Sequence, residues 1–137
     1  MAEKLGRIES RAVVDRMLDE AEKRGFEFAV AVVDPSGHII SAGRTDGATA
    51  LNVRMAYNKA YTSIIWQADT KSLRERLIEG EKKPMDWFGD PLLTPVWGGV
   101  LLRASDGTIL GAVGESGPPE EVDEELARIG EKHFKAL

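Results

Sequence analysis

The sequence predicts an α+β fold in which helices flank a central antiparallel sheet of four to five strands. Two hairpins carry this prediction. The turn 34–37 (Asp-Pro-Ser-Gly) and the pair Asp106-Gly107 each lie between two apolar, strand-like segments. Segments with apolar residues at helical spacing precede, separate and follow the hairpins. The expected order of elements is α-β-β-α-α-loop-β-β-α, which is typical of an α+β domain with profilin-like α/β/α layers.

The N-terminal part of the chain is expected to form a helix followed by the first hairpin. Apolar residues recur at i, i+3 and i+4 from about Leu5 to Arg24, and Gly25 follows at the position expected of a helix C-cap. Residues 26–34 are apolar on both faces, which predicts a central strand covered on both sides. Residues 38–42 are expected to return beside it as the second strand.

A central helix is predicted from about residue 48 to residue 66, with Thr45 or Asp46 as its candidate N-cap. This helix has two apolar stripes. Because a helix that is apolar on two sides is usually buried on both, we expect it to lie between two layers or between subunits. A shorter helix is expected over residues 69–79, where Gly80 would end it.

Residues 80–99 are irregular and rich in proline and aromatic residues, among them Trp87, Phe88 and Trp97. A loop of this length in a small domain tends to be functional or to pack at an interface, so it either closes over a ligand or contacts a second subunit. The second hairpin is expected over residues 100–113. The last helix should begin at Pro119.

The composition limits the possible functions. The chain has 137 residues and a net charge of −5, so we expect one domain over residues 1–137 and no nucleic-acid or anionic-membrane partner. It has no cysteine, which excludes disulfides, thiolate nucleophiles and zinc–thiolate sites. The N-terminal residues lack the apolar core of a signal peptide, and no apolar run is long enough to span a membrane. A cytoplasmic protein is therefore expected.

Four side chains near the first hairpin and the central helix are candidate functional groups. His38 could ligate iron or act as a general base, and the alternative is an exposed polar residue after a turn. Arg44 and Asp46 could hold an anionic ligand beside a helix N-terminus, and the alternative is an N-cap with a local ion pair. Lys59 could be a base or an anion partner, and the alternative is a buried stem with its ammonium group in solvent.

The segment 111–117 is rich in glycine and precedes a helix, so its backbone N–H groups and Ser116 could hold a carboxylate. The alternative is a turn that needs positive φ angles. Acidic side chains near this turn could perform acid–base chemistry or hold a cation, and the alternative is charge matched to a helix dipole: Glu115, Glu121 and Asp123. We predict no metal site. Thr62 on the central helix could line the same cavity.

A series of short motifs in order resembles the GlcG-like and HbpS-like haem-binding family, which also contains the C-terminal domain of PduO proteins. The motifs extend over nearly the whole chain, and they are 31–34 (AVVD), 37–39 (GHI), 44–48 (RTDGA), 59–62 (KAYT), Gly98-Gly99, 109–117 (ILGAVGESG) and Asp123. The resemblance implies a profilin-like fold and assembly into dimers or larger homo-oligomers. It also implies haem as a possible ligand.

Three functions follow from these observations. The first is a small-molecule binding protein whose pocket lies between the first hairpin, the central helix and the glycine-rich turn. Its expected ligand-binding residues are His38, Arg44, Asp46, Lys59, Thr62, Glu115 and Ser116. The second is an enzyme in which Lys59 or His38 moves a proton on a small carboxylated or aromatic catabolite. The third is a structural subunit that forms oligomers.

Overall fold

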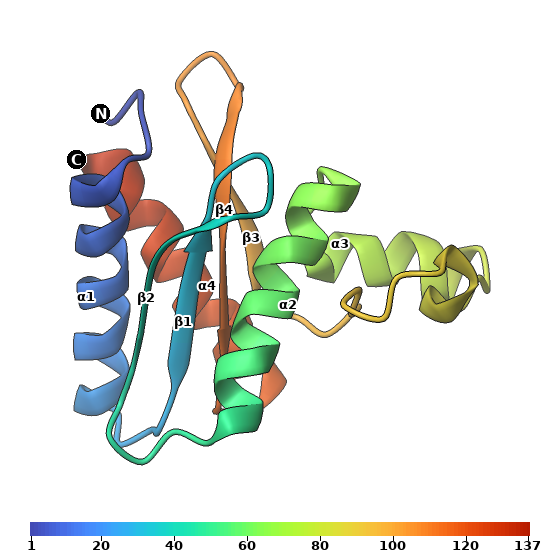
Figure 1. The fold of residues 1–137 in the computed structure, drawn as a ribbon, viewed down its shortest axis with the longest axis horizontal. Helices are drawn as coiled ribbons and strands as arrows, with labels where there is room; N and C mark the ends of the chain where they lie inside the picture. Colours follow the sequence, from blue (N-terminus) through green and yellow to red (C-terminus); the bar gives the residue numbers. More distant parts are fainter.

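The computed structural model describes residues 1–137 and has the predicted order of elements (Figure 1). Its four strands form one antiparallel sheet in the order β2-β1-β4-β3. The strands are β1 (Ala29–Val33), β2 (Ile39–Arg44), β3 (Gly99–Arg103) and β4 (Ile109–Ser116). The long helices are α1 (Arg7–Lys23), α2 (Ala50–Trp66) and α4 (Glu120–Ala136). The predicted fold class is confirmed.

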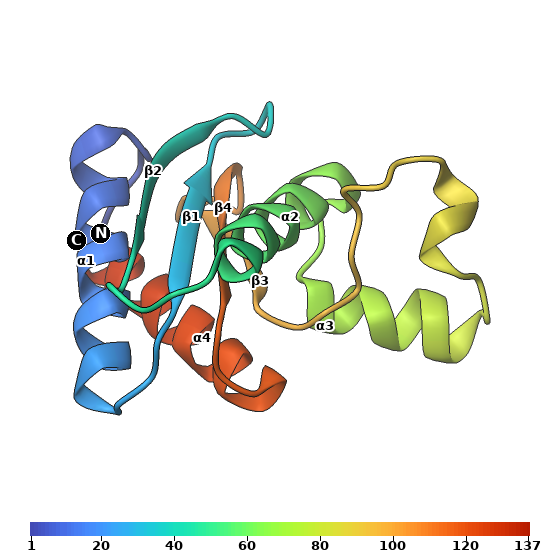
Figure 2. The ribbon, with the colours of Figure 1, turned by 60° about the horizontal axis from the view of Figure 1, so that its bottom comes forward.

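The sheet lies between two helical layers. Helices α1 and α4 cover one face and α2 covers the other (Figures 1 and 2). The larger apolar core lies on the α1/α4 side, where Val30 and Val32 of β1 meet Met17 and Phe134. The alternate residues of β1, Ala29 among them, face α2. Strand β1 is therefore apolar on both faces because both faces are covered, as the sequence predicted.

Helix α2 lies unusually close to the sheet because glycines face it. Gly99 and Gly114 are paired across β3 and β4. A Cβ atom at Gly114 would lie 2.2 Å from the carbonyl oxygen of Ala56, and one at Gly99 would lie 2.4 Å from that of Lys59. A side chain at either position would push α2 away from the sheet. The glycine-rich segment thus forms part of β4, and Gly114 within it allows the backbone of α2 to contact the backbone of the strand.

Local hydrogen bonds define the end of α1 and the start of α2. Gly25 has φ +80° and follows α1, and the N–H groups of Gly25 and Phe26 donate to carbonyl groups of the last helical turn. Helix α2 starts later than expected. Its N-cap is Thr49, whose hydroxyl accepts from the N–H of Asn52, so the prediction of Thr45 or Asp46 as the N-cap was wrong.

The two sides of α2 differ in burial. One stripe packs on the sheet through Ala56, Ala60 and Ile64. The other side of the helix leaves Leu51 and Ile65 exposed. Within one chain, the sheet covers one side of α2, and these two apolar side chains are left open to another molecule or a ligand.

The segment after α2 projects from the body of the molecule (Figure 2). It consists of α3 (Thr70–Leu73), a π-helical stretch η1 (Arg74–Gly80) and a 3₁₀ turn η2 (Met85–Phe88). The chain then returns along α2. The hydroxyl of Tyr61 donates to Asp90, and the N–H of Thr94 donates to Thr62. Residues 80–99 are therefore ordered by contacts with α2 rather than structureless.

None of the helices is both long enough and apolar enough to cross a lipid bilayer.

Candidate functional site

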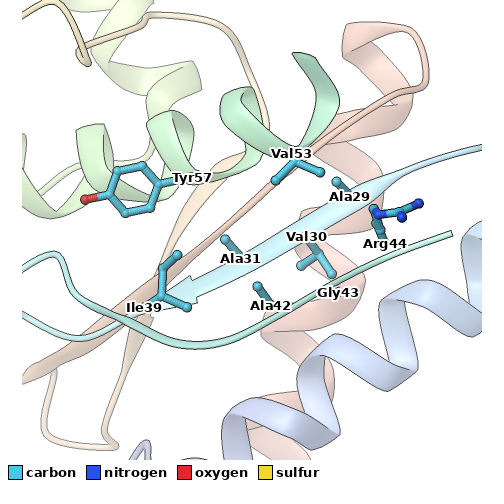
Figure 3. A pocket seen from close by; sticks show the side chains of 9 residues that line it. All are labelled: Ala29, Val30, Ala31, Ile39, Ala42, Gly43, Arg44, Val53 and Tyr57. Carbon is cyan, nitrogen blue, oxygen red and sulfur yellow. The ribbon is translucent and has the colours of Figure 1, made fainter. Parts of the chain in front are cut away.

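A cavity of about 270 Å³ lies between α2 and the β1–β2 hairpin (Figure 3). Its lining is mostly apolar and comes from both strands and one helix: Ala29, Val30, Ala31, Ile39, Ala42, Gly43, Arg44, Val53 and Tyr57. The cavity opens at the edge of the sheet, because β2 is an edge strand. Its mostly apolar lining with one charged residue is typical of a small-molecule site, and its volume lies just below the usual range of about 300–1,000 Å³.

The hollow exists because small side chains form its floor. Ala29 and Ala31 of β1 face α2, and their partners in the register of the sheet are Arg44 and Ala42 of β2. Alternate residues of a strand share one face, so three alanines lie side by side below the helix. Val53 and Tyr57 stand above them on α2 (Figure 3).

The two ends of the cavity differ in chemistry. Arg44 lies at one end and Tyr57 and Ile39 at the other (Figure 3). The register pairs Arg44 with Ala29 and Ile39 with Val33, so four strand steps, or about 13 Å, separate the two ends. The site therefore combines an apolar centre with a cationic end.

Arg44 keeps donors free for a ligand. One nitrogen of its guanidinium group, Nη1, donates to the backbone carbonyl groups of Thr45 and Asp46. These bonds hold the arginine at the strand end and leave the other nitrogens available to an anion. Asp46 is exposed, makes no ion pair with Arg44 and does not line the cavity, so the structure does not bring the two side chains together there.

The turn that follows β2 is held by a residue that sequence reasoning missed. The Glu27 carboxylate accepts from the Thr45 hydroxyl and from the N–H of Gly47 at 2.8 Å. The Thr45 hydroxyl also accepts from the N–H of Phe28. Glu27 thus holds the turn between β2 and α2.

The opposite end of the cavity brings Tyr57 close to His38. The Tyr57 hydroxyl donates to the carbonyl oxygen of Gly37 at 3.0 Å, and Gly37 immediately precedes His38. The His38 side chain is 81% exposed, and its Nδ1 lies 3.8 Å from a carboxylate oxygen of Asp34. His38 itself does not line the cavity, but its neighbour Ile39 does.

Lys59 lies in the interior rather than in the cavity. It is 1% exposed, and its Nζ donates to Asp123 Oδ2 at 2.9 Å and to the carbonyl oxygen of Glu115 at 2.8 Å. Glu115 is fully buried as well. The expected group of Lys59 and Glu115 therefore exists, but it is sealed from solvent. A proton-transfer role for Lys59 stays a prediction, and this geometry favours a structural one.

The remaining expected site residues lie elsewhere. Thr62 is buried, donates to the carbonyl oxygen of Asn58 and accepts from the N–H of Thr94, so it anchors the long loop to α2. Ser116 ends β4 opposite Ala29 and does not line the cavity. Glu121 is exposed and separated from Glu115 and Asp123 in environment. No group of three or more histidine or acidic side chains could hold a metal ion.

Of the residues that line the cavity, sequence reasoning singled out Arg44. It missed the alanine floor and the walls formed by Ile39 and Val53. A signal was present in the alternating alanines of β1, Ala29 and Ala31, and in the alanine of β2, Ala42. Small residues in a sheet allow a helix either to pack directly on them or to stand off and leave a cavity. Only the position of the helix decides which of these occurs.

Comparison with known proteins identifies the family. Residues 8–131 match the family described as "Haem degrading protein HbpS-like". This match spans most of the chain. The chain belongs to the HbpS-like family. A curated relative, "Protein GlcG" of Escherichia coli strain K12, is 31% identical over 105 residues, which are 77% of this chain and 75% of that protein.

Solved structures have the same fold. A double mutant of HbpS from Streptomyces reticuli superposes with a TM-score of 0.82 at 28% identity, covering 96% of this chain and 88% of that one. A PduOC:Heme complex superposes with a TM-score of 0.85 at 20% identity, covering 95% of this chain and 94% of that one. Both structures thus share the overall fold of this chain.

Proposed function

We propose that this protein binds a flat, largely apolar small molecule that carries an anionic group, and that haem is the ligand class to test first. The observation that carries the proposal is the cavity below α2, with its alanine floor and with Arg44 at one end. An apolar hollow with few fixed polar groups is the usual form of a small-molecule site. The family description and the haem complex of PduOC support haem as the ligand.

The residues of the cavity fit a haem-like ligand in chemistry. Ile39, Val53 and the alanines offer contact to an apolar ring, and the guanidinium group of Arg44 suits a carboxylate such as a propionate. His38 would supply the nitrogen ligand, since it lies beside the end of the cavity opposite Arg44. When bound, haem would supply an iron centre able to take up a further ligand or exchange an electron.

The cavity of one chain encloses part of a large ring, so a haem-like ligand would remain partly exposed. This fits the further proposal that the protein works as a homo-oligomer. Apolar side chains around the same face of the molecule are exposed, namely Leu51, Val53, Ile65, Trp87 and Phe88. Exposed apolar groups of this size usually mark an interaction surface.

A haemin titration with a cavity-filling variant tests the binding site. Ala42→Trp places a large side chain on the cavity floor from an exposed edge-strand position, and Ala136→Trp makes the same change on an exposed residue at the end of α4. We expect the haemin absorption band to shift for the wild-type protein and for Ala136→Trp, and not for Ala42→Trp. Equal binding by all three proteins would place the ligand elsewhere.

The same titration tests the iron ligand. We expect His38→Ala to bind haemin with a changed band position, because the nitrogen ligand that His38 would supply is lost while the apolar contacts remain. An unchanged spectrum would exclude His38 as the ligand. An unshifted haemin spectrum for the wild-type protein at high concentration would contradict haem binding itself.

A further inference from the structure

A buried ion pair joins the two helices that cover opposite faces of the sheet. Lys59 belongs to α2 and Asp123 to the first turn of α4, and their charged atoms are 2.9 Å apart. Gly98 makes this approach possible. It has φ +117°, and a Cβ atom there would lie 3.2 Å from Lys59 Nζ and 3.3 Å from Asp123 Cβ. The junction is thus closely packed and excludes water.

A second carboxyl group lies in the same junction and has no cation of its own. Glu115 is fully buried, and neither oxygen of its carboxyl group receives a hydrogen bond from a donor. Asp123 Oδ1 also lacks a donor. Lys59 Nζ bonds both the carbonyl oxygen of Glu115 and Oδ2 of Asp123, so the two acidic residues meet at one buried cation. A buried carboxylate with neither a donor nor a cation of its own is costly to keep ionised, so we expect one of the two acids to hold a proton.

The other charged groups around the junction do not supply a second positive charge. Arg74, from η1, binds Glu120 at the start of α4 through both of its terminal nitrogens. Arg128, further along α4, binds Asp69, Glu124 and Glu131. Glu124 adds a buried carboxylate oxygen without a partner. One free charge, that of Lys59, therefore faces two acids.

We propose that Glu115 and Asp123 share one bound proton in the folded protein at neutral pH, and that this proton latches the start of α4 to α2. With the proton present, the junction holds one positive and one negative charge, and the unpartnered oxygens of the two acids share a hydrogen bond. When the proton leaves, two negative charges face Lys59 in a dry site, and the segment from β4 to α4 loosens.

The bound proton makes the folded state less stable as the pH rises. Burial raises the pKa of Glu115 well above its usual value of 4.5, and the charge of Asp123 adds to this rise while that of Lys59 opposes it. The stabilising effect is therefore fully present below the unfolded pKa and is lost as pH rises through the folded pKa. At a pH between the pKa of the unfolded state and that of the folded state, folding takes up one proton. The folding equilibrium constant therefore falls tenfold for each unit by which the pH rises.

The test compares Glu115→Gln with the wild-type protein by urea unfolding from pH 5 to pH 9. Glutamine keeps the size of the side chain and can donate to Asp123 at every pH. We expect the ratio of the folding equilibrium constants, variant over wild type, to rise with pH by up to tenfold per unit. The matched control is Glu121→Gln, which removes the same charge from an exposed residue in the first turn of α4.

Parallel stability curves for Glu115→Gln and the wild type would overturn the proposal, because the latch would then hold no proton. A measurement on the wild-type protein decides the question if the variant fails to fold. We expect the infrared carbonyl band of a protonated carboxyl group at pH 7, and its loss at high pH together with faster amide exchange in residues 115–124. Absence of that band at pH 7 would equally refute the latch.

Discussion

Arg44 shows how one residue gives direction to an otherwise apolar cavity. Arg44 is the last residue of β2 and is paired with Ala29. Its Nη1 donates to two backbone carbonyl groups of the following turn. The guanidinium group is therefore fixed before a ligand arrives, and less side-chain entropy is lost on binding. A carboxylate at this end would set the orientation of the rest of the ligand.

Replacing Arg44 should weaken ligand binding without unfolding the protein. Arg44 is exposed and makes no ion pair, so we expect Arg44→Gln to fold normally. Loss of a charge-assisted hydrogen bond to a carboxylate costs about 1.5–3 kcal/mol, which is roughly a 10- to 100-fold rise in Kd for haemin. Arg7→Gln, an exposed residue at the start of α1, is the control. Equal affinity for both variants would exclude a role for Arg44.

At the scale of the elements, the contact between α2 and the sheet sets the shape of the site. Gly99 and Gly114 bring the α2 backbone against β3 and β4 at one side of the sheet. Over β1 and β2 the helix stands above alanines instead, and the hollow remains there. One rigid helix thus makes a close contact and a cavity along the same sheet, because the closest contact fixes its height everywhere.

A methyl group at Gly114 should test whether the close contact of α2 with the sheet sets the shape of the cavity. The added Cβ would lie 2.2 Å from a backbone oxygen of α2, so the helix must move. We expect Gly114→Ala to lower the free energy of unfolding by about 1–3 kcal/mol, the usual cost of overpacking. Gly107→Ala, at an exposed turn with φ +89° and no atom within 4 Å of the new Cβ, separates backbone strain from overpacking.

The measurement for these glycine variants is urea unfolding combined with haemin titration. Because a raised α2 changes the cavity wall, Gly114→Ala should alter haemin affinity as well as stability, whereas Gly107→Ala should alter stability alone. A stable Gly114→Ala protein with unchanged affinity would show that α2 does not determine the shape of the cavity.

At the scale of the whole molecule, five of the nine exposed large apolar side chains lie on α2 and its projecting segment. Trp87 is 68% exposed at the 3₁₀ turn η2, while the neighbouring Phe88 packs edge-on against Trp66 of α2. Trp97, at the base of the segment, lies below the charged groups of Lys71 and Arg74. The base of the segment is therefore well anchored, and its tip presents an aromatic side chain to a partner.

Removal of that aromatic group should weaken assembly and leave the subunit intact. Aromatic residues at the centre of an interface often contribute about 2 kcal/mol or more to binding. We expect Trp87→Ser to shift the protein to smaller species in sedimentation velocity, with an unchanged far-UV spectrum. Ile8→Ser, an exposed residue on α1 at the opposite side of the sheet, is the control. An assembly unaffected by Trp87→Ser would place the interface elsewhere.

The elements of the fold were predictable because their signals are local. The turn 34–37, the Asp106-Gly107 pair and the glycine after α1 each act within a few residues, and the structure has a hairpin or a helix end at each. The N-cap of α2 was misplaced by a few residues because Thr45, Asp46 and Thr49 all have side chains that can cap. Sequence alone does not rank such neighbouring candidates.

The sequence by itself determined the order of the elements, the two hairpins and the family. The tertiary structure decided which candidate residues meet. Lys59 joins Asp123 across 64 residues of chain and leaves the cavity to residues that were not singled out, such as Ala42 and Val53. The physical reason is that turns and helix ends depend on neighbours in the chain, whereas a cavity or a buried charge pair depends on how closely a helix packs against a sheet.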